Sequence, residues 1–74
     1  MNEQQALDYA SDNLITVTTD VKTKSGTYFL VGTYRVQNFG RLWRVLGKHQ
    51  FTGRRGDCIY HAVIETLNDR SDES

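Results

Sequence analysis

The stretch VKTKSGTYFLVGTYRVQNFGRLWRVLGKHQFTGRRG, residues 21–56, decides the fold of this 74-residue chain. It contains six of the eight aromatic rings, and its apolar residues alternate with polar ones over most of its length. Alternation of this kind, interrupted by glycines, predicts β-strands that are joined by turns. The centre of the chain is therefore expected to form an antiparallel sheet.

The same stretch carries charges of one sign only. Residues 1–20 and 57–74 each have a net charge of −4, whereas residues 21–56 have +8, so the formal net charge of zero hides a basic centre between two acidic ends. The eight cationic residues are Lys22, Lys24, Arg35, Arg41, Arg44, Lys48, Arg54 and Arg55. Folding does not require such segregation, which makes it a candidate functional feature.

Three strands are expected in and just before the basic stretch. The first covers residues 14–21, where β-branched side chains occupy every second position. The second covers residues 27–37, in which Gly32 is interpreted as a bulge that exchanges the two faces. The third covers residues 41–51 and begins after a turn.

A helix is expected at each end of the chain. Residues 3–10 are good helix formers with an acidic residue at the start, which the helix dipole favours. Asp57 is expected to be the N-cap of a second helix that runs to about residue 68 and packs its apolar side on a sheet. Residues 69–74 are polar and are expected to form a disordered tail. The predicted fold is α+β, with a short N-terminal helix, a three-stranded antiparallel sheet and a C-terminal helix packed on one sheet face (αβββα).

Length and composition limit the class of protein. Residues 1–74 form a single small domain, and a domain of this size buries only about 60% of the surface that its unfolded chain exposes. No apolar run approaches the roughly 20 residues that cross a bilayer, and the first residues lack the basic and apolar parts of a signal peptide. Cys58 is the single cysteine, so an internal disulfide is ruled out. A cytoplasmic protein without a membrane partner is expected.

Basic side chains interleaved with aromatic rings predict a surface for an acidic partner, and nucleic acid is the commonest such partner. In this interpretation the cations contact phosphates, and Tyr34 or Trp43 stacks on bases if its ring is exposed. The candidate phosphate contacts are Arg35, Arg41, Arg44, Lys48, Arg54 and Arg55. In the alternative interpretation most of the rings fill the small core, and the charges lie on the solvated side of the strands.

The segment Gly53-Arg54-Arg55-Gly56 is the sharpest local feature of the basic stretch. Two glycines bracket two arginines before a helix N-terminus, where backbone N–H groups and guanidinium groups can bind a phosphate. The carboxylate of Asp57 would repel a phosphate at that place. A turn with two solvated arginines is an equally good interpretation.

The predicted order of helix, three strands and helix over residues 3–68 is similar to that of double-stranded RNA-binding domains, which place basic residues at the start of the last helix. The likeness is one of topology. This chain has no Gly-Pro-x-His loop between its first two predicted strands, and it carries Cys58, Ile59, Tyr60 and His61 where that family has lysines. We assign no family on this basis.

No catalytic or metal-binding constellation is predicted. Cys58 and His61 lie one helical turn apart and His49 is a conceivable third ligand, but a zinc site needs three or four ligands. A buried apolar cysteine is the better interpretation of Cys58. The sequence shows no Ser–His–Asp grouping and no phosphate-binding fingerprint. A non-enzymatic protein without a cofactor or a metal is expected.

Two functions of different classes follow from these patterns. The first is a small nucleic-acid-binding module for DNA or RNA. The second is a protein–protein interaction or inhibitor module, for example a protein of a phage or another mobile element that binds a host complex. In such a module the acidic ends would matter as much as the basic centre. Charge segregation would also suit self-association, for example as a homodimer. The position of the acids relative to the cations in the folded chain distinguishes the two functions.

Overall fold

The computed structural model describes residues 2–24, 26–47 and 49–72, which form two helices and one antiparallel sheet. The elements in chain order are α1 (Glu3–Asp12), β1 (Val17–Thr23), β2 (Gly26–Val31), β3 (Tyr34–Phe39), β4 (Leu42–Leu46), β5 (Phe51–Gly53) and α2 (Arg55–Asp72). The predicted α+β class, the two terminal helices and the antiparallel sheet are confirmed. The predicted number of strands is wrong, because the sheet contains five, in the order β1-β2-β3-β4-β5. This order also differs from the three-stranded topology of double-stranded RNA-binding domains.

The sheet contains two tight hairpins, of which the one at Gly32 divides the predicted second strand into β2 and β3, while the other lies where a turn was predicted. Val31 pairs with Tyr34, and Phe39 pairs with Leu42, so each connection contains only two residues. The first residue of each connection is a glycine with positive φ, +61° at Gly32 and +65° in the second hairpin. A glycine at this place is typical of a type II′ turn, whose twist matches that of the flanking strands. Gly32 is therefore a turn residue, and its interpretation as a bulge was wrong.

The hairpin at Gly32 changes which side chains face the core. A two-residue turn places Tyr34 and Val36 on the same face as Val31 and Phe29, opposite to the arrangement that an uninterrupted strand would give. All four of these side chains are buried. The core row across the sheet therefore includes Phe29, its partner Val36, and Val45 beyond it.

The predicted third strand, residues 41–51, is divided into β4 and β5. Gly47 follows β4 and lies directly against the ring of buried Tyr34, which leaves no room for a β-carbon. The chain then returns, and Phe51 of β5 pairs with Val45. Lys48 in this connection lies outside the described residues.

Both edges of the sheet carry features that discourage pairing with another strand. β1 has a register shift between Thr18 and Val21, and it carries the exposed Lys22. β5, at the other edge, has only three residues. Bulges, lysines and short edge strands are the common means by which sheets avoid edge-to-edge association. A binding surface is therefore more reasonably sought on a face of the sheet than along its edges.

Local hydrogen bonds set the limits of α1. The side chain of Asn2 accepts from the N–H of Gln5, whose own side chain accepts from the N–H of Asn2, which is a capping box. At the other end, the N–H of Ile15 donates to Ala10 O (2.9 Å) and Leu14 adopts a positive φ of 58°. This Schellman-type ending turns the chain toward β1 and carries Ile15 into the core.

α2 begins earlier and ends later than the sequence predicts. The N–H of Cys58 donates to Arg54 O, so Arg54 is the N-cap and Asp57, predicted to be the N-cap, lies in the first turn. The helix continues to Asp72, which corrects the predicted end near residue 68 and places 69–72 of the predicted tail in the helix. Two contacts support this last part, because Asp69 accepts from the hydroxyl of Tyr34 and the Arg70 guanidinium donates to Asn13 O.

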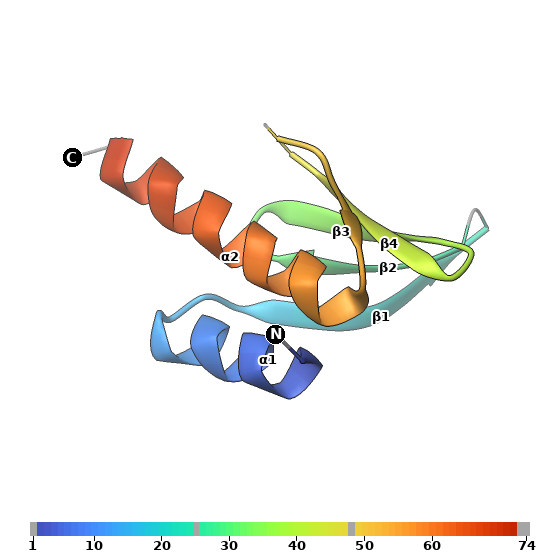
Figure 1. The fold of residues 1–74 in the computed structure, drawn as a ribbon, viewed down its shortest axis with the longest axis horizontal. Helices are drawn as coiled ribbons and strands as arrows, with labels where there is room; N and C mark the ends of the chain where they lie inside the picture. Colours follow the sequence, from blue (N-terminus) through green and yellow to red (C-terminus); the bar gives the residue numbers. More distant parts are fainter. Residues whose placement is uncertain (1, 25, 48, 73–74) are drawn as a thin grey trace.

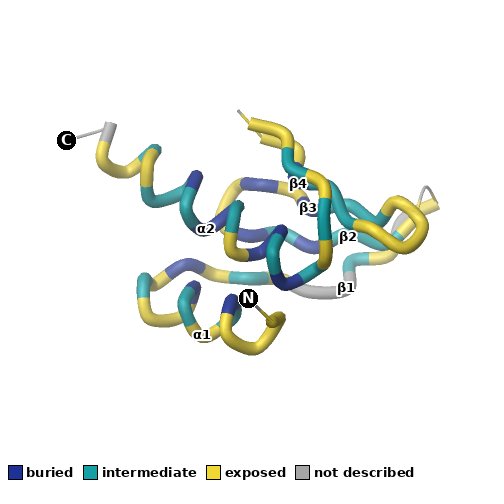
Figure 2. Tube along the Cα trace, viewed as in Figure 1, coloured by how far each residue is buried: buried dark blue, intermediate teal, exposed yellow. Residues whose placement is uncertain are grey.

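The helices and the sheet form two layers. α2 crosses one face of the sheet and contacts β2, β3, β4 and β5, while α1 packs beside α2 (Figure 1). Buried residues concentrate where α2 passes over the strands, and the hairpin between β3 and β4 is exposed (Figure 2). Within the described parts of the chain, neither helix is long and apolar enough to cross a lipid bilayer. α2 leaves the opposite face of the sheet uncovered.

Candidate functional site

The uncovered face of the sheet presents a row of apolar, aromatic and basic side chains. Its members alternate along the strands with the buried Phe29, Val31, Val36 and Val45, so they point away from α2. We call this surface the open face, and it comprises Tyr28, Leu30, Arg35, Gln37, Phe39, Leu42, Arg44 and Leu46. Three of its large apolar side chains are well exposed: Phe39 at 48%, Leu42 at 46% and Leu46 at 37%. Phe39 and Leu42 are cross-strand partners, and exposed apolar neighbours on a small domain are typical of a binding surface.

Each of the two arginines on the open face lies over an aromatic ring. The guanidinium carbon of Arg35 is 4.3 Å from the centroid of the Tyr28 ring, and that of Arg44 is 4.6 Å from the centroid of the Phe39 ring. Both distances are within the range of cation–π attraction. Arg44 Nε also donates to Thr52 Oγ1 (3.2 Å). These contacts hold the two cations flat on the sheet.

Folding separates the charges of the chain into two layers. α1 and α2 contain seven of the nine acidic residues, while Asp20 is in β1 and Glu73 lies outside the described residues. The strands and their hairpins contain Lys22, Lys24, Arg35, Arg41 and Arg44. None of the eight side chains that make up the open face, all of them from β2, β3 and β4, is a carboxylate. The open face is therefore cationic and the helical layer is acidic.

Three of the predicted phosphate contacts belong to the sheet. Arg35 and Arg44 lie on the open face, and Arg41 is exposed in the hairpin between β3 and β4. None of these three forms an ion pair with a described carboxylate. Their charges are available to an acidic partner.

The other two described arginines of the predicted set lie at the start of α2. Arg55 forms an ion pair with Glu3, and its guanidinium carbon is 5.1 Å from the Phe29 ring and 5.2 Å from the Trp43 ring. Arg54 is exposed beside a polar concavity of about 500 Å³, which Glu3 and Asp57 also line. The carboxylates of Glu3 and Asp57 would repel an anion in this concavity. The contacts of Arg55 are those of a structural residue that joins the two helices to the core.

The two rings that the sequence suggested for stacking lie on the covered side of the sheet. Tyr34 is only 7% exposed, and its hydroxyl donates to Asp69. Trp43 is half-buried and packs against Phe29 with ring centroids 5.1 Å apart. Neither ring can reach a ligand bound on the open face.

The rings that the open face does present are Tyr28 and Phe39, which sequence reasoning did not select. A signal for Tyr28 was present, because it alternates with the strongly apolar Phe29 and Val31. Phe39 was assigned to a turn, which hid its place in β3 opposite Leu42. Gln37, which lies on the open face between Tyr28 and Phe39, was also not predicted as a site residue.

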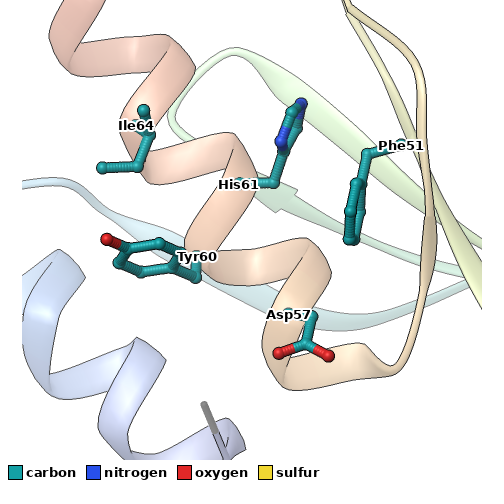
Figure 3. A pocket seen from close by; sticks show the side chains of 5 residues that line it. All are labelled: Phe51, Asp57, Tyr60, His61 and Ile64. Atoms are coloured by element: carbon teal, nitrogen blue, oxygen red, sulfur yellow. The ribbon is translucent and has the colours of Figure 1, made fainter.

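A second concavity, of about 570 Å³, lies on the outer side of α2 and is lined by Phe51, Asp57, Tyr60, His61 and Ile64 (Figure 3). The imidazole ring of His61 stacks on the Phe51 ring, with the two ring centroids 4.8 Å apart. The same imidazole has its Nε2 3.1 Å from His49 O. The Nδ1 atom of His49 is 3.0 Å from Oε1 of the buried Glu65. These contacts fasten β5 and the preceding loop to α2.

Cys58 is fully buried under the sheet. Its Sγ donates to Trp43 O (3.2 Å) and more weakly to Gly53 O (3.7 Å), so it does not join the histidines. No group of three potential metal ligands occurs within residues 2–24, 26–47 and 49–72. Burial, together with the nearby charge of Asp57, raises the pKa of the thiol from 9.0 to about 11, against a smaller opposing effect of the Gly53 hydrogen bond.

The raised pKa of Cys58 predicts a slow reaction with alkylating reagents. A pKa of about 11 in place of 9.0 lowers the thiolate fraction at pH 8 about a hundredfold, and the thiolate is the reactive form. We expect iodoacetamide to modify the folded protein at least about a hundredfold more slowly at pH 8 than the protein unfolded in guanidinium. Between pH 9 and pH 10 the native rate should still rise nearly tenfold, whereas the unfolded thiol is already half ionised at pH 9 and its rate should less than double. Equal native and denatured rates at pH 8 would contradict the buried position.

Comparison with known proteins gave no matching family model, no matching curated protein and no matching solved structure. The functional conclusion is therefore drawn from the geometry of the open face.

Proposed function

We propose that this protein is a small, non-enzymatic nucleic-acid-binding module that uses the open face of its sheet. The single observation that carries the proposal is the separation of charge between the two layers. Arg35 and Arg44 project from the open face and Arg41 is exposed in the hairpin beside it, whereas seven of the nine acidic residues are on the two helices behind the sheet. A surface of this kind attracts a polyanion and keeps the acidic layer away from it.

Two features of the open face and of the hairpin beside it support this function. Arg35, Arg41 and Arg44 can contact phosphates without first breaking an ion pair with a described carboxylate. Tyr28 and Phe39 place rings beside these cations. Arginines interleaved with rings on a solvent-facing sheet are typical of surfaces that bind the backbone and the bases together.

A protein–protein or inhibitor module remains the second candidate because of one specific observation. Leu42 and Leu46 are exposed together with Phe39, and an apolar, aromatic and arginine-containing patch has the composition of a protein interface. In that case Leu42→Glu should abolish a protein contact that survives nuclease treatment of a cell lysate.

The salt dependence of binding tests the proposed function. Three phosphate contacts on a single strand give a slope of log affinity against log salt of about −2, which corresponds to a loss of roughly twentyfold between 50 and 200 mM salt. Arg35→Gln or Arg44→Gln should each weaken binding and make the slope shallower by about 0.7. Fluorescence anisotropy with labelled RNA and DNA oligonucleotides measures both quantities.

Arg54→Gln is the matched control, since it removes the same charge from an exposed position away from the open face. Its affinity and slope should remain close to those of the unmodified protein. Absence of binding to every oligonucleotide at 20 mM salt would overturn the proposed function.

A further inference from the structure

Two composite platforms lie on the open face on either side of Gln37. The first consists of the Tyr28 ring with the Arg35 guanidinium, and the second of the Phe39 ring with the Arg44 guanidinium. Gln37 pairs directly with Tyr28 on one side and with Arg44 on the other. The two platforms are therefore related by an approximate twofold rotation about Gln37. We infer that the nucleic acid bound here is single-stranded, with one base stacked on each platform.

This inference rests on the proposed function and adds to it the structural class of the ligand. The first argument is the spacing of the platforms. Their centres differ by one strand and by two residues along the strand, which amounts to about 8 Å. Neighbouring bases within one strand of a duplex are only about 3.4 Å apart along the axis. Stacked neighbours in a duplex cannot occupy both platforms, but the separated bases of an extended single strand can.

The second argument is the chemistry of a stacking surface. Guanidinium planes and aromatic rings both bind the flat faces of bases, and those faces are covered by neighbouring bases within a duplex. Arg35 in the first platform and Phe39 in the second are exposed, and their partners Tyr28 and Arg44 are half-buried, so each platform has one member that a flat group can reach. The Gln37 amide between them can donate to and accept from the edge of a base.

The third argument is the position of the helices. A helix that reads a duplex must present a basic, exposed side to a groove. α1 has no lysine or arginine. The two arginines of α2 are engaged elsewhere, Arg55 with Glu3 and Arg70 with Asn13 O. Both helices thus belong to the acidic layer and lack the means to enter a groove.

The deciding experiment compares a labelled 12-nucleotide single strand with the blunt duplex of the same sequence, as RNA and as DNA, by anisotropy at 50 mM salt. The single strand is expected to bind at least about tenfold more tightly. A duplex that binds equally well or better overturns the inference and leaves the proposed function intact. If neither form binds, even at 20 mM salt, the proposed function itself fails.

Charge-preserving variants test the platforms separately. The double variant Arg35→Lys/Arg44→Lys keeps both charges but loses both planar groups. Its affinity for the single strand should fall about tenfold while the salt slope is unchanged. Tyr28→Leu/Phe39→Leu should cause a loss of similar size, and Tyr60→Leu, which removes a ring from the helical layer, should cause none. Unchanged affinity in the lysine variant would overturn base stacking on the platforms.

A measurement on the unmodified protein makes the test independent of how the variants fold. Addition of the single strand should shift the ring-proton NMR signals of Tyr28 and Phe39 and leave those of Tyr34 and Trp43 in place, because the latter two lie on the covered side. Shifts confined to Tyr34 and Trp43 would place the ligand elsewhere and overturn the inference.

Discussion

Replacing Phe29 with alanine is expected to destabilise this domain by about 3–5 kcal/mol, the largest effect of any substitution considered. Phe29 is fully buried at the centre of the core row and is paired with Val36. Its ring also contacts Trp43 and lies under the guanidinium of Arg55. Truncation to alanine thus removes buried apolar surface, and it also removes the ring that Arg55 contacts at the start of α2.

The size of the domain makes this loss severe. At about 0.05–0.15 kcal/mol per residue, a chain of 74 residues has a free energy of unfolding of roughly 4–11 kcal/mol. The substitution should therefore remove from about a quarter to all of this free energy, and unfolding by heat and by urea, followed by circular dichroism, should occur at a much lower temperature and urea concentration than in the unmodified protein.

Phe39→Ala is the matched control for Phe29→Ala. It removes the same atoms from a ring that is 48% exposed on the open face. We expect a change in unfolding free energy of no more than about 0.5–1 kcal/mol, together with weaker nucleic-acid binding. Equal destabilisation by the two substitutions would contradict the assignment of Phe29 to the core and Phe39 to the open face.

Gly47→Ala is expected to destabilise the domain by about 2 kcal/mol, although the residue is at the surface. A β-carbon at Gly47 would lie 2.5 Å from two carbons of the Tyr34 ring. That ring cannot move away easily, because it is buried and its hydroxyl is bonded to Asp69. The melting temperature should fall by roughly 8–16 °C in a domain of this size.

Two further variants show whether the clash with Tyr34 is the cause. In a Tyr34→Ala background, Gly47→Ala should cost little, because the obstructing ring is gone. Gly53→Ala brings its β-carbon to 3.0 Å from the half-buried ring of Phe51, which has more room to shift, and should cost less than about 1 kcal/mol. Additive effects of Gly47→Ala and Tyr34→Ala would point to a different mechanism.

Local patterns were sufficient to predict the fold class. The helix-forming residues 3–10 and the apolar side of the last helix predict both helices, since the 3.6-residue period is a property of the local sequence. Likewise, the alternation over residues 42–46 puts Trp43 and Val45 on the face opposite to Arg44, and the structure shows that the face of Trp43 and Val45 is the covered one. Residues that are close in sequence decide these features.

The pairing of strands was where local patterns failed. A glycine inside an alternating run is compatible with a bulge and with a two-residue turn, and the two alternatives differ in the number of strands, because only the turn reverses the chain. Gly32 forms the turn, so Tyr34 faces the core and its neighbour Arg35 faces solvent. Tyr34 and Trp43 were proposed for stacking only if exposed, and the local pattern did not show which face of the sheet the last helix covers.

The sequence by itself determined that the cations lie together along the chain between two acidic ends, because this is a matter of residue order. Only the tertiary structure decided that these segments become opposite layers and that Arg35 and Arg44 lie over Tyr28 and Phe39. The physical reason is that both outcomes depend on strand register and on the face that α2 covers. These are set by packing between residues far apart in the sequence, which no local pattern contains.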